Sequence, residues 1–237
     1  MLEVHKAVPA VALIELKNLT KTYRLGDETL HALDGVSIAV NAGEFVAITG
    51  PSGSGKTTLA NIIGGLDWPT GGTVVVDGND LSHVRDNKLS AYRNKYVGFV
   101  FQSFNLQGTQ TALENVMLPL VFAKMRPKAR LTRAIACLQA VGLGDRLRHR
   151  PSQLSGGQRQ RVAIARALAV GPRIIIADEP TGNLDSQRGQ EIMKLLQELN
   201  RRGITLLVIT HDSTIARQAG RIVQIRDGRI AERRAAA

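Results

Sequence analysis

Short runs of apolar residues divide the chain into alternating strands and helices. In the first half they predict strands at residues 11–16, 36–40, 44–49, 73–76 and 96–101. In the second half they predict buried strands at residues 173–177 and 205–210. Helices are expected at residues 55–64 and between the last two strands, where apolar residues recur at helical spacing (Ile192, Leu195, Leu196, Leu199). This alternation predicts an α/β fold with a largely parallel sheet.

The stretch from residue 103 to residue 160 has a different character. It contains long helical segments, a basic cluster, and two prolines, Pro119 and Pro127, where helix breaks are expected. We therefore predict a helical subdomain inserted into a core that ends in a hairpin turning at Asp227-Gly228. The chain would then be one domain, residues 1–237, made of a loose arm, a discontinuous core, the insertion and a tail (1–11, 12–102 with 161–231, 103–160, 232–237).

The strongest chemical signal follows the predicted strand at 44–49. Residues 50–57, Gly-Pro-Ser-Gly-Ser-Gly-Lys-Thr, fit the phosphate-loop pattern G-x-x-x-x-G-K-[ST] at every fixed position, between a strand and a helix. The glycines let backbone N–H groups point at phosphate oxygens, and the helix N-terminus adds positive partial charge. Lys56 would reach the β- and γ-phosphates, and the Thr57 hydroxyl would bind Mg²⁺. The nucleotide-binding residues predicted here are Gly50, Ser52, Gly53, Ser54, Gly55, Lys56, Thr57 and Thr58.

Two carboxylates follow the apolar run at residues 173–177. The carboxyl ends of parallel strands are where α/β proteins bind ligands. Asp178 is therefore expected to contribute to the Mg²⁺ shell. Glu179, one residue later, would polarise the attacking water as a general base.

Residues 154–158, Leu-Ser-Gly-Gly-Gln, precede an Ala-rich helix. Ser155 and Gln158 have the spacing of a capping box, and Gly156 and Gly157 leave N–H groups accessible for a second anion. Taken alone, the segment is equally compatible with an ordinary capped helix. As an anion site, it would give one chain two phosphate-binding helix ends and a single nucleotide pocket. A head-to-tail dimer, in which this loop caps the γ-phosphate held by the other subunit, resolves that mismatch.

Together these motifs resemble the ABC transporter ATPase family, and the resemblance extends from about Leu13 to Ala231. It implies a P-loop, RecA-like core with a mainly parallel sheet, an antiparallel β-subdomain and an inserted α-helical subdomain. It also implies ATP hydrolysis with ATP and Mg²⁺ as cofactors. The implied partners are a second copy of the chain and an integral membrane permease.

The resemblance assigns further roles residue by residue. Tyr23 matches the aromatic residue that stacks on adenine, and Gln102 matches the catalytic glutamine that contacts Mg²⁺ and water. His211 matches the catalytic histidine at the γ-phosphate, and Asp185 ends a loop, Asn183-Leu184-Asp185, expected at the dimer interface. The residues expected to contact the nucleotide held by the other subunit are Ser155, Gly156, Gly157 and Gln158.

The sequences of three segments, at residues 101–106, 111–116 and 178–185, together resemble one branch of the family. That branch includes the ATPases of lipoprotein release, of macrolide and antimicrobial-peptide export, and of cell division. Residues 107–110, Gln-Gly-Thr-Gln, differ from the Leu-rich or Pro-containing sequence that many relatives have there. The identity of the cognate permease is therefore left undetermined. Mechanical signalling, as in cell division, stays an alternative to transport.

The chain has 31 Lys and Arg against 20 Asp and Glu, a net charge of +11. Within residues 124–150 there are eight basic residues and one acid, Asp145, and we expect this segment to face the membrane and the permease. Nucleic acid would use the same charge, but the ABC ATPases that act on it carry two cassettes, long coiled coils or zinc-binding cysteines. The single cysteine, Cys137, cannot build a zinc site, so no nucleic acid is expected. A P-loop kinase or GTPase would leave residues 154–158 without a role.

Two negative features suggest a location. No apolar run approaches the roughly 20 residues that cross a bilayer. The first ten residues contain Glu3 and Pro9 and lack the apolar core of a signal peptide. We therefore expect a cytosolic chain that is held at the cytoplasmic face of a bacterial inner or plasma membrane by its permease.

Overall fold

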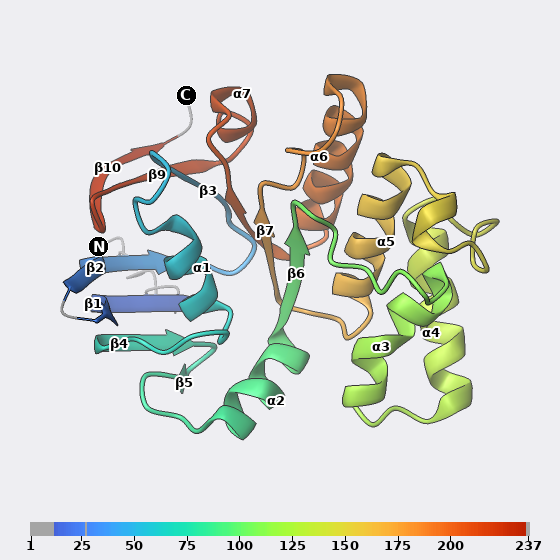
Figure 1. Ribbon diagram of the computed structural model, residues 1–237, viewed down its shortest axis with the longest axis horizontal. Coiled ribbons are helices and arrows are strands. Elements are labelled where there is room, and N and C mark those ends of the chain that lie inside the picture. Colours follow the sequence, from blue (N-terminus) through green and yellow to red (C-terminus); the bar gives the residue numbers. More distant parts are fainter. Residues whose placement is uncertain (1–11, 27, 236–237) are drawn as a thin grey trace, which may run out of the picture.

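The computed structural model describes residues 12–26 and 28–235, so the expected arm at 1–11 and the last two residues of the expected tail lie outside the described residues. Figure 1 shows two sheets on one side of a group of helices. The strands are β1 (Ile14–Leu25), β2 (Glu28–Val40), β3 (Phe45–Thr49), β4 (Gly71–Val76), β5 (Asn79–Asp80), β6 (Val97–Phe101), β7 (Ile174–Asp178), β8 (Thr205–Ile209), β9 (Arg221–Arg226) and β10 (Arg229–Ala235). The helices are α1 (Lys56–Ile63), α2 (Asp86–Tyr96), α3 (Ala112–Phe122), α4 (Pro127–Ala140), α5 (Gly156–Leu168), α6 (Ser186–Arg201) and α7 (Ser213–Ala216), with a short 3₁₀ turn (Pro151–Gln153).

The larger sheet has the strand order β10-β9-β3-β8-β7-β6. Its pairs are parallel from β9 through β3, β8 and β7 to β6, and only the edge strand β10 is antiparallel. The expected α/β class and mainly parallel sheet are confirmed. Parallel strands joined by helical crossovers are covered on both faces, which explains why β7 and β8 read as continuous apolar runs.

Alternating residues of the central strands belong to two different cores. In β7, Ile175 and Ala177 pack with helices α3 to α7. Ile174 and Ile176 point to the other face and pack with α1, α2 and the smaller sheet. This split follows from the two-residue period of a strand. Because both faces are buried, the register of the central strands is tightly fixed.

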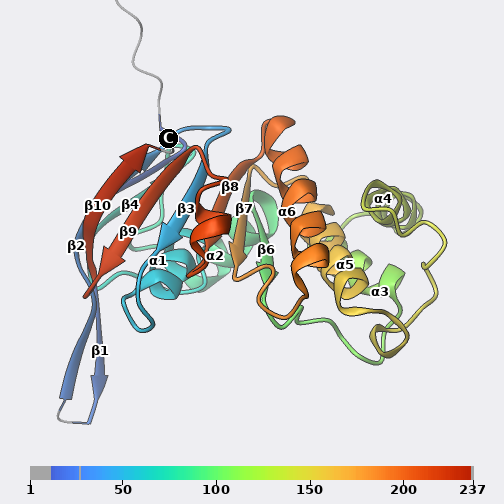
Figure 2. The same cartoon turned by 90° about the horizontal axis from the view of Figure 1, so that it is seen from above.

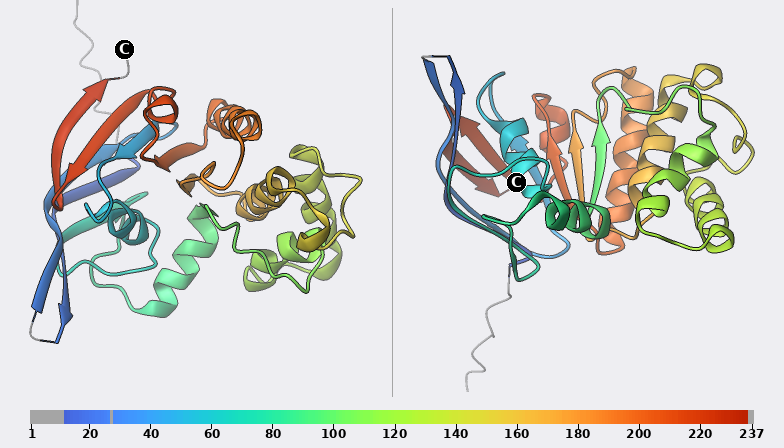
Figure 3. Two further views of the ribbon diagram at one scale, coloured as in Figure 1. Left: turned by 45° about the horizontal axis from the view of Figure 1, so that its top comes forward. Right: turned by 60° about the horizontal axis from the view of Figure 1, so that its bottom comes forward.

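The smaller sheet is antiparallel, with the order β2-β1-β4-β5, and confirms the expected β-subdomain. The expected strands at 11–16 and 36–40 were too short, because β1 and β2 continue into a long hairpin. Figures 2 and 3 show this hairpin extending away from the rest of the molecule. Its outer part is polar and exposed, so apolar periodicity did not reveal it.

Two further expectations about the elements were wrong, and one helix was missed. Pro119 was expected to break a helix but lies inside α3, where the fully buried Val116 and Leu120 on either side hold the helix against the core. Helix α2 was not expected, because only Leu89 and Tyr92 on it are buried. The expected tail at 232–237 is a strand as far as Ala235, since β10 pairs with β9 beyond the predicted turn at Asp227-Gly228.

Helices α3 and α4 lie inside the expected insertion at 103–160, whereas α5 crosses its boundary and continues to Leu168. These helices share one apolar core with a face of the large sheet. The division into a core and a helical subdomain stays a prediction. Among the described residues, no helix is both long enough and apolar enough to cross a membrane.

Candidate functional site

The central strands end in one row, and the predicted site residues follow that row. In the hydrogen-bonded register, Ile48 of β3 lies beside Ile209 of β8. Ile209 lies beside Asp178 of β7, which in turn lies beside Phe101 of β6. The chain therefore leaves all four strands at the same edge of the sheet. The segments that start there contain Gly50, His211, Glu179 and Gln102.

The phosphate loop curls tightly between β3 and α1. Gly50 has a φ of +147°, and a Cβ atom added to it would lie 2.0 Å from the carbonyl oxygen of Ile225. Gly55, the N-cap of α1, has a φ of +103°, and its Cβ would lie 2.3 Å from the carbonyl oxygen of Ala32. Both the backbone angle and the space therefore require glycine at these two positions. Gly55 supplies no side-chain cap, so the first backbone N–H groups of α1 are left for a ligand to satisfy.

Two polar side chains lie inside this loop. The Lys56 ammonium donates to the carbonyl oxygens of Gly50 at 2.9 Å and Pro51 at 2.6 Å. Within the described part of the chain, the buried Ser54 hydroxyl has no hydrogen-bond partner. A buried unpartnered hydroxyl and a cation beside helix N-terminal amides fit the phosphates of a nucleotide.

Asp178 and Thr57 are brought together from distant parts of the chain. The Thr57 hydroxyl donates to Oδ2 of Asp178 at 3.4 Å. Burial raises the pKa of Asp178 and the charge of Glu179 raises it further, against a lowering by Thr57 and Lys56. A carboxylate and a hydroxyl beside a phosphate loop are the oxygen ligands that Mg²⁺ takes in such sites. The donor set therefore fits a magnesium ion bound together with nucleotide phosphates.

Glu179 is held in a strained conformation by three contacts. Its φ is +46°, a left-handed value that costs of order 1 kcal/mol or more for a non-glycine residue. Oε1 accepts from the backbone N–H of His211 at 3.0 Å and lies 2.6 Å from His211 Nδ1. Oε2 accepts from the buried Thr210 hydroxyl at 3.3 Å. No motif marks Thr210 for this contact, because a threonine that ends a β-rich run gives no signal beyond strand propensity.

Gln102 connects the strand edge to the helices. Its side-chain amide donates to Asn183 Oδ1 at 3.4 Å, and the Asn183 amide donates back to the Gln102 carbonyl at 2.9 Å. The following residues Phe104 and Asn105 both have positive φ. Their carbonyl groups accept hydrogen bonds from the Arg166 guanidinium of α5. The Gln102 loop is thus tied to the loop at 183–185 on one side and to α5 on the other.

The segment at 154–158 forms the capping box expected from its sequence. Ser155 is the N-cap of α5, and its hydroxyl accepts from the Gln158 N–H at 3.3 Å, while Gln158 Oε1 accepts from the Ser155 N–H at 2.9 Å. A Cβ on Gly156 would lie 3.1 Å from Leu184, so this segment adjoins the loop at 183–185. That loop ends at Asp185, whose carboxylate caps α6. Helices α1 and α5 lie on opposite sides of β6 and β7 (Figures 1 and 2). The two glycine-rich helix ends therefore belong to separate parts of one chain.

Tyr23 lies on β1 in a polar cluster that the sequence did not reveal. Its hydroxyl donates to Asp67 Oδ2 at 2.6 Å, and the Lys21 ammonium donates to Asp67 Oδ1 at 2.6 Å. Burial raises the pKa of Tyr23 and Asp67 raises it further, while a hydrogen bond from Thr58 lowers it. Thr58 follows the phosphate loop, so the Tyr23 ring lies close to α1. Nothing in the sequence marked Asp67, because an Asp before Trp-Pro reads as an ordinary turn residue.

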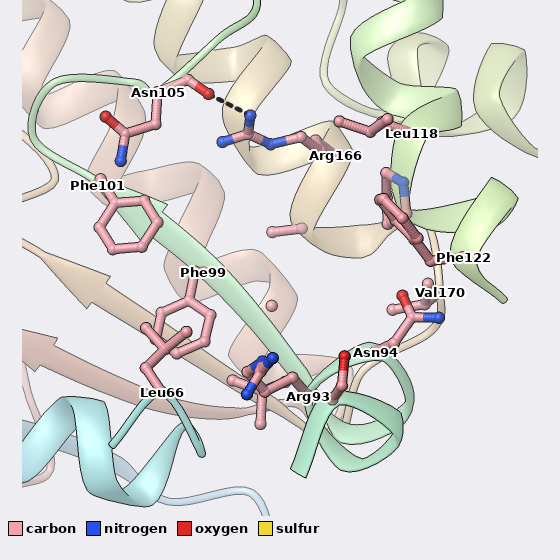
Figure 4. Close-up of a pocket in the computed structure, with 15 residues that line it drawn as sticks. Leu66, Arg93, Asn94, Phe99, Phe101, Asn105, Leu118, Phe122, Arg166 and Val170 are labelled. Carbon is pink, nitrogen blue, oxygen red and sulfur yellow. Dashed lines mark hydrogen bonds between the residues drawn. The ribbon is translucent and has the colours of Figure 1, made fainter. Parts of the chain in front are cut away.

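A hollow lies between α2, β6, α3 and α5. It is a groove of about 430 Å³. Figure 4 shows Phe99 and Phe101 of β6 in it, with Leu66 on one side and Phe122 on the other. Asn105 and Arg166 line the same groove, so it borders the Gln102 loop.

Comparisons with known proteins show the family to which the chain belongs. A family model described as "ABC transporter" matches residues 33–182. The chain is 53% identical over 218 residues to the macrolide export ATP-binding/permease protein MacB of Brucella melitensis, a match that covers 92% of the chain but 34% of that relative. It is 54% identical over 217 residues to an uncharacterized ABC transporter ATP-binding protein of Thermotoga maritima, covering 92% of the chain and 93% of the relative.

A solved structure is also similar along nearly the whole chain. The ATP-binding cassette MJ0796 of Methanocaldococcus jannaschii, described as a dimer in a post-hydrolysis state bound to ADP and Pi, matches with a TM-score of 0.87 and 48% identity. The match covers 94% of this chain and 99% of that one. The chain therefore belongs to the ABC transporter family and is an ATP-binding ATPase. The macrolide-export relatives also confirm the predicted branch of the family.

Proposed function

We propose that two copies of the chain assemble head to tail around two MgATP and drive a membrane permease by hydrolysing them. The observation that carries the proposal is the single row of strand ends. It gathers the phosphate loop, Asp178, Glu179 and His211 at one edge. Helix α5, which begins after Ser155, lies across β6 and β7 from the helix α1 that follows the phosphate loop (Figures 1 and 2). Ser155 and its neighbours therefore need a nucleotide from a second copy. The dimeric form of the related MJ0796 cassette supports this arrangement.

Each residue at the strand edge has a task in this scheme. The Lys56 ammonium and the loop amides neutralise and orient the β- and γ-phosphates. Thr57, Asp178 and Gln102 would hold the magnesium ion, which supplies charge compensation on the phosphate oxygens when bound. Glu179 accepts a proton from the attacking water, held in position by Thr210 and by His211. His211 and the glycine-rich end of α5 from the other copy then contact the γ-phosphate.

Tyr23 would stack on the adenine, and Asp185 would lie at the interface between the two copies. The Tyr23 hydroxyl donates to Asp67 and also lies within hydrogen-bond reach of Thr58, which anchors this end of the ring beside the phosphate loop. Asp185 caps α6 directly beside the Ser155 segment. Both placements are compatible with one continuous nucleotide site shared by two chains.

The apolar groove of Figure 4 is where we place a cytoplasmic helix of the permease. Exposed apolar side chains, Leu66 and Phe122, line it, and it borders the Gln102 loop that responds to nucleotide in this scheme. The MacB relatives are named as macrolide export proteins that contain both an ATP-binding part and a permease, and this chain spans 34% of such a relative. We therefore infer export, or extraction of a substrate from the membrane, by a permease that holds this chain at the cytoplasmic face.

Complementation between two inactive variants tests the head-to-tail dimer. Gly157→Leu adds bulk at the α5 end, where a Cβ would meet Arg188 at an ordinary 3.5 Å, so the fold should be retained. Lys56→Ala removes the phosphate cation. Each variant alone should lack turnover, but a mixture should recover about a quarter of the wild-type rate, because half of the dimers are mixed and each has one intact site.

The control is a mixture of Lys56→Ala with Thr57→Ala. Both changes lie in the same half of the site, so no mixed dimer would contain an intact site and no activity should return. Equal rates in the two mixtures would show that residues 154–158 only cap a helix. Co-purification of a membrane protein by the wild-type chain but not by Phe122→Glu would support the groove assignment, and co-purification by both would contradict it.

A further inference from the structure

Helices α3 and α4 are joined by an exposed segment, which we call the α3–α4 tip and define as residues 121–131. Figure 1 shows it at the lower right edge of the molecule. The tip contains four cations, Lys124, Arg126, Lys128 and Arg130. No Asp or Glu occurs anywhere in residues 115–144. The one acid of α3 and α4 is Glu114, in the first turn of α3, at the end of that helix away from the tip.

The four cations of the tip are also free of acids from other elements. Throughout residues 12–26 and 28–235, none of them lies within 4.0 Å of a carboxylate. The rest of the basic segment differs. Arg133 donates to the carbonyl oxygens of Leu168 and Ala169 at the end of α5, and Arg146 lies 3.2 Å from Asp145. Only part of the basic segment is therefore available to an anionic partner.

Exposed apolar side chains lie among these cations. Phe122 is 70% exposed, Val121 47% and Leu131 43%, and they are half of the six large exposed apolar residues found in the described chain. Leu131 follows Lys128 by one turn and lies on the same side of α4 as Ala134 and Leu138, but near the N-terminal end of the helix, where the core leaves it exposed. The inner face of that helix is buried through Ala134 and Leu138. The tip thus presents basic and apolar groups together on one exposed surface.

We propose that the α3–α4 tip binds the surface of an anionic lipid bilayer. Cations that lack acidic partners attract lipid phosphates, and neighbouring apolar side chains enter the boundary between headgroups and acyl chains. A nucleic acid would use the cations but has no use for exposed Val121 and Leu131. Because Phe122 also lines the apolar groove, the tip adjoins the surface assigned to the permease. The inference rests on the proposed function only where it places the tip next to the permease.

Vesicle binding by the full chain tests the proposal without any permease. The probe is a vesicle of equal parts phosphatidylglycerol and phosphatidylcholine, compared with pure phosphatidylcholine, in a sedimentation assay. The wild-type chain should bind the anionic vesicle and should not bind the vesicle of pure phosphatidylcholine. Neutralising Arg126, Lys128 and Arg130 to Gln should lower the partition coefficient on the order of 100-fold, at about fivefold for each cation. Leu131→Ser should lower it severalfold without changing charge.

The matched control neutralises three other exposed cations, Arg24, Lys88 and Lys194, which lie on three different elements. This control has the same net charge as the tip variant and should retain vesicle binding. Equal losses in the two variants would overturn the proposal, since binding would then follow total charge. Unchanged binding by the tip variant, together with loss of duplex DNA binding at physiological salt, would assign the tip to nucleic acid instead.

Failure of this inference is distinguishable from failure of the proposed function. If the wild-type chain ignores anionic vesicles but the tip variant no longer co-purifies with the membrane protein, the tip contacts the permease and the lipid proposal is wrong. The ATPase scheme would then still stand. Basal ATP hydrolysis should be equal in all of these variants, because none of the changed residues belongs to the nucleotide site.

Discussion

Replacing Asp67 by Ala should destabilise the protein through a pair of residues far apart in sequence. Lys21 is 10% exposed at its side chain and Asp67 is 21% exposed, and their charged atoms are 2.6 Å apart. Without Asp67, the Lys21 ammonium keeps its hydrogen bond to the carbonyl oxygen of Trp68, at 2.7 Å, and its contact with the Tyr23 ring, 4.8 Å from the centroid, but it loses its anionic partner. The Tyr23 hydroxyl loses its acceptor. Breaking a buried pair costs about 3–5 kcal/mol, and an exposed pair is worth about 0–1. For this partly buried pair we expect Asp67→Ala to lower the free energy of unfolding by about 2 kcal/mol.

Thermal unfolding monitored by circular dichroism measures this effect. For a chain of this size, about 2 kcal/mol corresponds to a fall in Tm of about 4–8 °C. The matched control is Asp86→Ala. The Asp86 side chain is 72% exposed and its carboxylate lies 3.8 Å from Arg93. Its removal should change the free energy of unfolding by less than about 1 kcal/mol. Adding Lys21→Met to Asp67→Ala should recover part of the loss, since no buried charge then lacks a partner. Equal Tm values for the two single variants would refute the reasoning.

The same pair predicts a dependence on pH. Burial acts to raise the pKa of Asp67, but hydrogen bonds from Lys21, Tyr23 and the Trp68 N–H together hold it below its ordinary value. A carboxyl whose pKa is lowered on folding contributes its full stabilisation above its unfolded pKa, about 3.9, and loses it as the pH falls through the folded pKa. The difference in unfolding free energy between wild type and Asp67→Ala should therefore be constant from pH 5 upward and shrink below about pH 4.

Four further predictions concern the nucleotide site. Lys56→Ala should abolish tight binding in a titration with a fluorescent ATP analogue, and near wild-type affinity would contradict the phosphate-loop assignment. Glu179→Gln should bind ATP, lose about 10²–10⁴ in hydrolysis rate and form an ATP-dependent dimer in size exclusion; normal turnover would exclude Glu179 as the base. Thr210→Val should lower kcat with KM unchanged, and Thr210→Ser should restore it, because the hydroxyl donates to Glu179. Gly55→Ala should weaken ATP binding, since its Cβ would lie 2.3 Å from the carbonyl oxygen of Ala32; unchanged affinity would show that the loop can relax.

The elements that apolar periodicity predicted well are those with both faces buried. The runs at 173–177 and 205–210 became β7 and β8 almost without change, because a strand covered on both faces must be apolar throughout. The elements that were missed or shortened are polar ones. Helix α2 and the outer parts of β1 and β2 have few buried residues, so their formation depends on the neighbours they pair with. Pro119 shows the opposite case, in which tertiary packing overrides a local signal.

The sequence by itself determined the chemistry of this protein. The phosphate loop, the Asp178-Glu179 pair and the capping box at 154–158 are each contained in a few consecutive residues, and the backbone conformation of each is a local matter. Only the tertiary structure decided which of them meet. Thr57 reaches Asp178, Thr210 reaches Glu179 and Lys21 reaches Asp67 because strand order and register bring them together. Register is set by simultaneous packing of both sheet faces, and no stretch of sequence carries that information alone.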